Sequence, residues 1–160
     1  MTTTQTDIYT DVRQWILSLI QGAESQVVRA YNNNVPIPEN AVIMTYLLEQ
    51  KLDQLTQETD DGIFYVGESI QVMMQLDAYG PLAKERLDKL TTFWKSMYTC
   101  DILKKCQPLY ATDVKDLTFV NETGQYELRF MTSLYLQYNR AYDVPVQAFT
   151  TIPNTELNNV

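Results

Sequence analysis

The sequence contains no histidine, and this absence removes several classes of enzyme at once. Imidazole is the commonest general base, completes Ser-His-Asp and Cys-His nucleophile systems, and is a ligand in many zinc sites. Two cysteines, Cys100 and Cys106, are too few for a four-thiolate zinc site. The five glycines form no GxGxxG or GxxxxGK pattern, so no phosphate-binding loop is predicted. We therefore expect a protein that is not an enzyme, with no metal and no cofactor.

The chain also lacks an apolar run long enough to span a bilayer, and its first residues resemble no signal peptide. We expect it to be made in a cytoplasm, away from membranes, with both cysteines as free thiols. Its net charge of −8 disfavours binding of nucleic acid by charge attraction. This charge either keeps the protein soluble or lines a surface beside which nucleic acid passes without sticking.

What the chain does contain is a clear succession of helical and strand patterns. Apolar residues at spacings of three and four predict helices over Thr6–Gln21 and from Gly80-Pro81 to Met97. Thr4 and Asp7 resemble a capping box before the first helix, and a shorter helical segment is expected over Thr99–Lys105. Strands are expected over the following ranges: Gln26–Tyr31, Ala41–Leu52, Ile63–Tyr79, Thr118–Glu122 and Tyr126–Tyr138.

These elements predict an α+β domain with a single antiparallel or mixed sheet of four to five strands and two helices packed on one face. Ala41–Leu52 and Ile63–Tyr79 are expected to form a hairpin, with Val42, Met44, Tyr46 and Leu48 on one face of its first strand. The polar stretch Thr56–Gly62 forms the hairpin's tip, and Pro108–Leu117 is expected to be irregular. The domain spans residues 1–142, and residues 143–160 form either a disordered tail or an arm that orders on a neighbour.

Few residues are candidates for a site. Asp60 and Asp61, near Glu58, could hold a metal or act as acid and base, but adjacent acids before a glycine are more often a solvated turn. Glu127 and Arg129 lie two apart on one expected strand face, so they are either an ordinary exposed ion pair or a charged pair that fixes a subunit contact.

Aromatic residues near the C-terminal end offer a second set of candidates. Tyr135, Tyr138 and Tyr142 could form a binding surface, although stabilisation of the sheet explains most of them. In the C-terminal arm, Pro145 and Phe149 join Tyr135 and Tyr142 as candidate contacts with a subunit or partner.

Three segments carry a resemblance to a known family. They are Asp7–Ile16, the strand-to-helix run Val72–Arg86, and Asp116-Leu117 followed by Glu127–Phe130. The most specific is the junction Ala78-Tyr79-Gly80-Pro81. In these segments, and in the order of elements to about residue 140, the chain resembles the tail (neck) terminator proteins of tailed bacteriophages. The stretch after Asp143 matches nothing in that family.

The resemblance implies a structural protein of the virion, assembled in the host cytoplasm and located at the tail–neck junction. It implies a homo-oligomeric ring, usually six-fold, that stops growth of the tail tube and joins the tail to the neck or connector. The implied partners are the tail tube protein, the connector protein and, in a contractile tail, the sheath. Genome DNA would pass through the channel without specific binding.

Three other hypotheses remain open from the residues. One is another neck or head-completion protein, or the equivalent cap of a phage-like contractile injection system. Another is an unrelated cytoplasmic protein-binding adaptor. The weakest is a carboxylate-based enzyme that depends on Asp60 or Asp61.

Overall fold

A computed structural model describes residues 2–22, 24–31 and 36–146 of the 160-residue chain. Within these ranges the chain forms three α-helices, one short 3-10 helix and nine β-strands. The helical elements are α1 (Gln5–Leu19), η1 (Glu24–Gln26), α2 (Ala83–Phe93) and α3 (Met97–Ile102). The strands are β1 (Val27–Arg29), β2 (Val42–Lys51), β3 (Thr56–Asp60), β4 (Ile63–Tyr79), β5 (Gln107–Ala111), β6 (Lys115–Asp116), β7 (Phe119–Val120), β8 (Tyr126–Glu127) and β9 (Arg129–Pro145).

The capping box predicted at the start of α1 is present. The Thr4 side chain accepts a hydrogen bond from the Asp7 amide at 3.2 Å, and the Asp7 carboxylate accepts one from the Thr4 amide at 2.8 Å. These bonds lower the pKa of Asp7 below its usual value, because they favour the charged carboxylate. The cap fixes where α1 begins and therefore which of its faces meets the sheet.

The two helices predicted after Gly80-Pro81 are both present, but the first ends before the predicted Met97 and the second begins before the predicted Thr99. α2 ends at Phe93, and Ser96 caps a new helix, α3, by accepting a hydrogen bond from the Thr99 amide at 3.3 Å. Buried Thr99 also accepts a hydrogen bond from the Trp15 indole at 2.8 Å and donates one to the Phe93 carbonyl. These tertiary bonds make a break between helices more favourable than one continuous helix.

Seven strands form one mixed sheet, so the prediction of four to five strands was too low. The strand order is β1-β2-β4-β9-β5, with β3 also pairing with β4 and β6 with β9. Only the β1–β2 pair is parallel, and the predicted hairpin of β2 and β4 is antiparallel. The three strands that were missed are β3, in the segment predicted to be a polar tip, and β5 and β6, in or beginning one residue before the segment predicted to be irregular.

The final strand also differs from its prediction. It begins at Arg129 and runs to Pro145, whereas Tyr126–Glu127 belongs to β8, which pairs only with β7 in a separate two-stranded hairpin. Asp143 to Pro145 are therefore part of the sheet. The division into a domain of residues 1–142 and an arm of residues 143–160 stays a prediction, since residues 147–160 lie outside the described ranges.

Alternation along the central strands places the core on one face of the sheet. In β4, Ile70, Val72, Met74, Leu76 and Ala78 are all fully buried, and they share one hydrophobic core with the apolar faces of α1 and α2. These two helices cover one face of the sheet, as predicted. In β2 a bulge between Tyr46 and Leu48 reverses the alternation, so Leu48 lies opposite Met73 on the other face.

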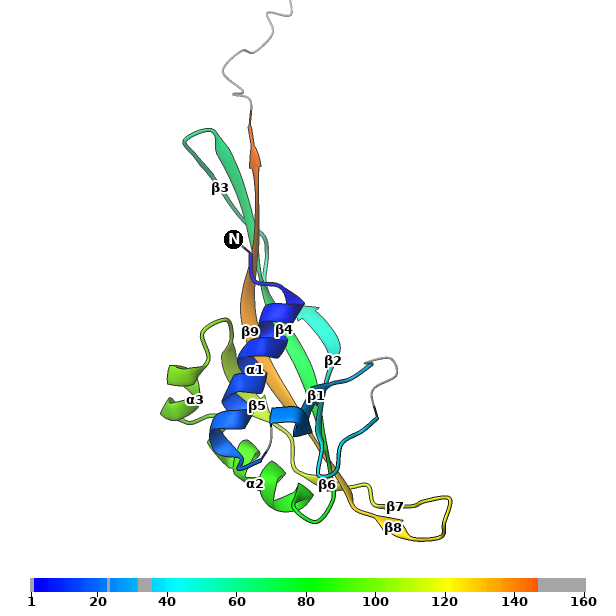
Figure 1. Cartoon of the computed structure of the whole chain (residues 1–160). Coiled ribbons are helices and arrows are strands. Elements are labelled where there is room, and N and C mark those ends of the chain that lie inside the picture. The colour runs from blue at the N-terminus through cyan, green and yellow to red at the C-terminus, as the bar shows by residue number, and fades with distance from the viewer. Residues whose placement is uncertain (1, 23, 32–35, 147–160) are drawn as a thin grey trace, which may run out of the picture.

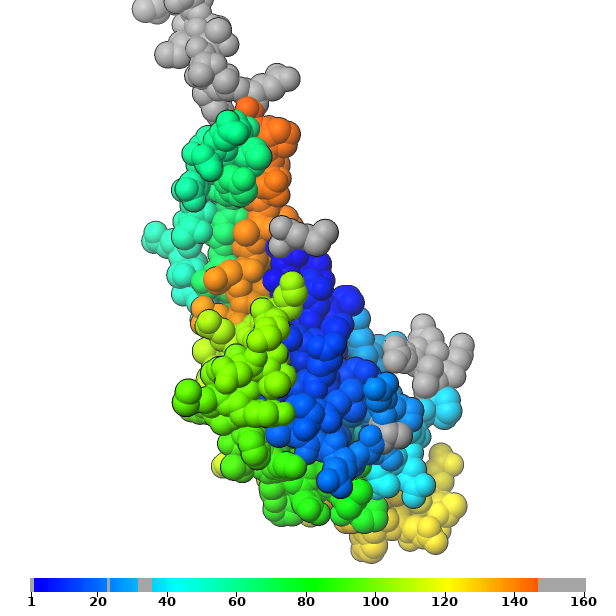
Figure 2. All heavy atoms as spheres, turned by 60° about the vertical axis from the view of Figure 1, so that its left-hand side comes forward, coloured from blue at the N-terminus to red at the C-terminus, as the bar shows by residue number. Residues whose placement is uncertain are grey.

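β4 and β9 pair along their full length of 17 residues and form the spine of the molecule. At one end the spine extends beyond the helices together with β3, and at the other end it leads to the β7–β8 hairpin (Figure 1). We call the first extension the tongue: it consists of β3, the turn at Asp61 and Gly62, residues 63–67 of β4 and residues 141–145 of β9. A space-filling view shows the tongue standing clear of the helix-covered body (Figure 2).

Candidate assembly surfaces

The tongue is a three-stranded ribbon whose two faces differ in chemistry. Directly opposed residues form rows across β3, β4 and β9, and the rows alternate between the faces. Two rows on the face that continues the core contain no charged side chain: Gln57–Val66–Tyr142 and Thr59–Phe64–Val144. Two rows on the opposite face carry acids: Glu58–Tyr65–Asp143 and Asp60–Ile63–Pro145. The tongue therefore presents an apolar face and an acidic face.

The tip of the tongue is a tight turn at Asp61 and Gly62. Both residues have positive φ, 43° and 74°, as a two-residue type I′ hairpin turn requires. Together with Glu58, Asp60 and Asp143, Asp61 gives the tongue four carboxylates and no lysine or arginine. Half of the net charge of −8 therefore lies on this one projection.

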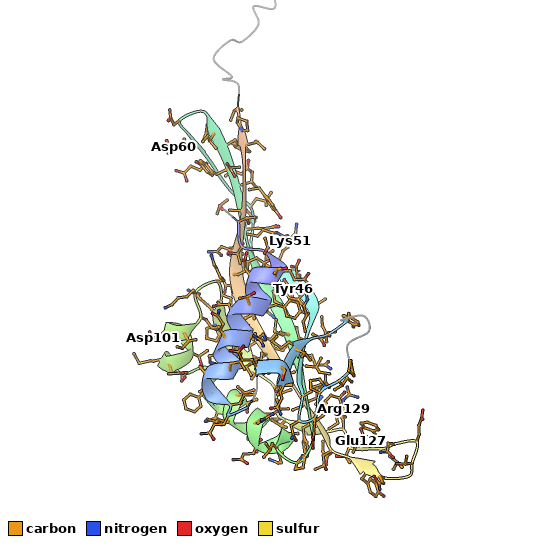
Figure 3. The ribbon with its side chains drawn as sticks, viewed as in Figure 1. Tyr46, Lys51, Asp60, Asp101, Glu127 and Arg129 are labelled. Carbon is orange, nitrogen blue, oxygen red and sulfur yellow. The ribbon has the colours of Figure 1, made fainter. Side chains whose placement is uncertain are left out.

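An ion-pair cluster marks the base of the tongue. The Arg140 guanidinium binds Glu68 and also reaches Glu49 at 3.3 Å, while Lys51 contacts Glu68 at 3.2 Å. The hydrogen bond from Arg140 lowers the pKa of Glu68, and the same bond raises the pKa of Arg140. Tyr138 donates to Glu49 at 3.2 Å, so the cluster joins β2, β4 and β9 where the covered core ends. Figure 3 shows Lys51 at this level and Asp60 at the tip of the tongue.

The sheet face opposite the helices forms a second surface. Tyr135 of β9 stacks on Tyr110 of β5 with ring centroids 4.3 Å apart, and its hydroxyl donates to the Met73 sulfur. Towards the other end of the same face, Arg129 pairs with the buried carboxylate of Asp77 at 2.8 Å. That bond raises the pKa of Arg129, and the pair lies between β4 and β9.

The β7–β8 hairpin forms a third surface at the far end of the spine. Its apolar side chains are unusually exposed, with Tyr126 at 80% and Val120 at 56%. A hollow of about 540 Å³ lies between this hairpin and the Ile37–Asn40 loop, next to the Gly80-Pro81 junction. The Asn40 side-chain oxygen is buried there and has no hydrogen-bond partner among the described residues.

Comparison with known proteins places the chain in a family. A family model described as phage neck terminator protein matches residues 6–160. The chain belongs to the phage neck terminator protein family. The match extends beyond residue 140, where the resemblance found in the sequence ended. A search of curated proteins finds no match.

Membership in the neck terminator family implies a structural role in a phage particle, in association with other tail or neck proteins. Within the described residues, no helix is both long and apolar enough to cross a membrane. Nor do three or more His, Cys, Asp or Glu side chains gather to hold a metal in that part of the chain.

The structure separates the residues predicted for the interface into two groups. Asp60, Asp61, Tyr142 and Pro145 all lie on the tongue. Glu127 and Arg129 lie towards the opposite end of the molecule (Figure 3). Tyr135, which pairs with Met73, lies between the two groups on the open sheet face. Phe149 lies outside the described residues. Whether any of these residues contacts a partner stays a prediction.

Glu127 and Arg129 do not share a strand face, as the sequence had suggested. Glu127 is on β8, where its carboxylate accepts a hydrogen bond from Asn121 at 3.1 Å, whereas Arg129 begins β9 and binds Asp77. Asp77 was missed because an acid on the outer side of a predicted strand gives no signal of its partner 52 positions away. The stacking of Tyr110 on Tyr135 was missed because Tyr110 lies in a segment predicted to be irregular.

Proposed function

We propose that this chain assembles into a ring, six-fold as its family resemblance implies, at the head-proximal end of a phage tail tube. The ring stops elongation of the tube and joins the tail to the neck connector. The observation that carries this proposal is the match of the neck terminator family model to residues 6–160. In a contractile tail, the sheath also contacts the ring.

The placement of the surfaces supports a joining role. A ring built head to tail needs two different complementary patches on each subunit. A protein that joins two structures also needs contacts at opposite ends, and this chain has the tongue at one end and the β7–β8 hairpin at the other. We assign Asp60, Asp61, Tyr142 and Pro145 to a contact made by the tongue. We assign Glu127 to a contact made by the hairpin, and Arg129 and Tyr135 to a contact made by the open sheet face.

The charge of the chain supports passage of DNA through such a ring. A basic channel would hold the phosphate backbone, whereas a net charge of −8 on each subunit does not. The concentration of carboxylates on one face of the tongue makes that face the best candidate for the wall of the channel.

Electron microscopy of particles from the source lysate, labelled with gold-conjugated antibody against this protein, tests the proposal. We expect one collar of label at the upper end of the tail, and the same collar on free tails that carry no head. Label on heads without tails would instead make this a head-completion protein. Particles without any label, with the protein abundant in the soluble fraction, would refute a role in the virion.

A truncation tests the contribution of the C-terminal segment. Removal of Asp143–Val160 would also take away the last strand residues of the tongue, so the better variant ends after Val146. We expect this variant to fold normally but to form fewer rings or attach less to tails. Unchanged assembly and attachment would exclude the segment as an assembly arm.

A further inference from the structure

Both outer strands of the tongue leave one backbone edge open. β3 pairs with β4 on one side, and no described strand pairs with its other side. β5 pairs with β9 only as far as Gln137, so residues 141–145 of β9 have no strand neighbour on that side among the described residues. Unpaired strand edges are templates for pairing with another chain.

The pattern of backbone hydrogen bonds identifies which groups face outwards. In a hairpin with a two-residue turn, the closing residues Asp60 and Ile63 bond to each other, so the Thr59 and Gln57 amides point away from β4. On β9, the Ala141 amide donates to the Thr2 side chain at 3.1 Å and so points away from β4. By the same alternation, the Asp143 amide also points outwards, towards the open edge. Because Pro145 has no N–H, Asp143 supplies the amide donor that remains for pairing on residues 141–145.

The two edges match each other in length and direction. Each spans five residues, 56–60 and 141–145, and both strands run antiparallel to β4 and hence parallel to one another. The edges lie on opposite sides of the ribbon, which is the arrangement that a head-to-tail contact between identical subunits requires.

We infer that the open edge of β3 in one copy of this chain pairs, in parallel, with the open edge of β9 in the next copy. This inference deepens the proposed function, on which it rests, by assigning the contact between subunits of the ring. The tongues then form a continuous collar. One face of the collar carries the rows that contain Phe64 and Val66, and the other carries the rows that contain Glu58, Asp60 and Asp143.

The side chains at the new junction fit this pairing unequally on the two faces. On the apolar face, Thr59 meets the next copy's Val144 or Tyr142, and β-branched and aromatic neighbours stabilise paired strands. On the acidic face, Glu58 and Asp60 approach the next copy's Asp143, and like charges side by side oppose pairing. Because this repulsion is screened by salt, assembly is expected to strengthen at about 1 M salt, where the screening length is about 3 Å.

Disulfide trapping gives a direct test. In one copy, Thr59 and Val144 stand two strands apart, about 10 Å, which is too far for a disulfide to join them. A Thr59→Cys/Val144→Cys variant, with Cys100→Ser to remove the exposed native thiol, can therefore cross-link only between copies. We expect a ladder of multimers on a non-reducing gel after mild oxidation. A Thr59→Cys/Tyr142→Cys variant tests the alternative register, in which the two paired strands are shifted by two residues. Each single-cysteine variant should give dimers at most.

Proline substitutions test the backbone bonds themselves. Thr59→Pro and Asp143→Pro each remove an outward N–H without removing a bond to β4, and proline is tolerated on edge strands. We expect each to weaken self-association of the full chain about tenfold in sedimentation experiments, corresponding to one lost hydrogen bond. The controls Thr59→Val and Asp143→Asn keep the N–H and should assemble as well as the parent or better. Unchanged thermal unfolding of the proline variants would show that the fold is intact.

The outcomes separate this inference from the proposed function. A chain that remains monomeric at every concentration and salt, or rings that form without a ladder and tolerate both prolines, would overturn the pairing of tongues. In the second case, gold label at the upper end of the tail would still support the neck role. Absence of label from particles, together with a clear ladder, would leave the pairing intact and refute the neck role.

Discussion

Two glycines with similar backbone conformations but different surroundings offer a matched test of the packing at the strand-to-helix junction. Gly80 has φ +90° and Gly124 has φ +77°, so alanine is strained at either position. A Cβ built on Gly80 would lie 2.3 Å from the Asn40 side-chain oxygen, whereas nothing lies within 4 Å of one built on Gly124. The two substitutions therefore differ mainly in a steric clash.

The expected magnitudes follow from these two contributions. Backbone strain in the left-handed region costs about 1–2 kcal/mol, and this is the whole cost expected for Gly124→Ala. Gly80→Ala adds overpacking against the Asn40 side chain, whose oxygen is buried, and this costs about 1–3 kcal/mol more. We expect its free energy of unfolding to fall by about 2–5 kcal/mol in total.

Asn40→Gly is the rescue variant, because Asn40 itself has a positive φ of 54° and glycine adopts such a conformation without strain. In urea unfolding with unchanged m-values, the Gly80→Ala/Asn40→Gly double variant should recover the clash contribution and lie near Gly124→Ala. Equal losses for Gly80→Ala and Gly124→Ala, or no recovery in the double variant, would refute the packing described at this junction.

Three further predictions concern groups that fix the body of the domain. Asp11→Ala should lower the free energy of unfolding by about 3 kcal/mol or more, because this buried carboxylate accepts hydrogen bonds from two backbone amides after α3. Asp11→Asn keeps one acceptor oxygen, so it should lower the free energy of unfolding by less in the same urea assay. A thiol reagent should modify only the exposed Cys100 in the native protein and both cysteines after unfolding, since burial raises the pKa of the Cys106 thiol. Rapid reaction of both thiols in the native protein would contradict this prediction. Because the pKa of Asp7 is lowered in the folded protein, its charged carboxylate contributes stability above the unfolded pKa of about 4, and this stability is lost as the pH falls through the folded pKa. Thr4→Ala should therefore destabilise the protein more at pH 7 than in acid, and a pH-independent loss would argue against the capping box.

The sequence predicted elements best where one face is buried and clear breakers stand at both ends. β4 has the predicted bounds, Ile63–Tyr79, because its alternation is long and Asp61-Gly62 and Gly80-Pro81 delimit it. α1 was predicted to within two residues at each end for similar reasons. In both elements the local pattern and the tertiary packing favour the same structure.

Elements without a buried face were missed. All five residues of β3 are exposed, so the strand has no apolar alternation, and only its pairing with β4 makes it a strand. The bulge in β2 was also missed, because one inserted residue reverses the alternation and the segment Leu47–Lys51 is exposed on both faces. The candidate site could be predicted only as individual residues, since the rows of the tongue depend on the register of three strands.

The unbroken pairing of β4 with β9 has a mechanical consequence. At about 3.4 Å per residue, the 17 pairs extend for about 55 Å and connect the two ends of the molecule. A pull between the tongue and the β7–β8 hairpin acts along these strands, so the hydrogen bonds of the ladder are loaded together in shear and do not open one at a time. A subunit held at both ends would therefore transmit tension through β4 and β9 with little extension, while its helices carry little of the load.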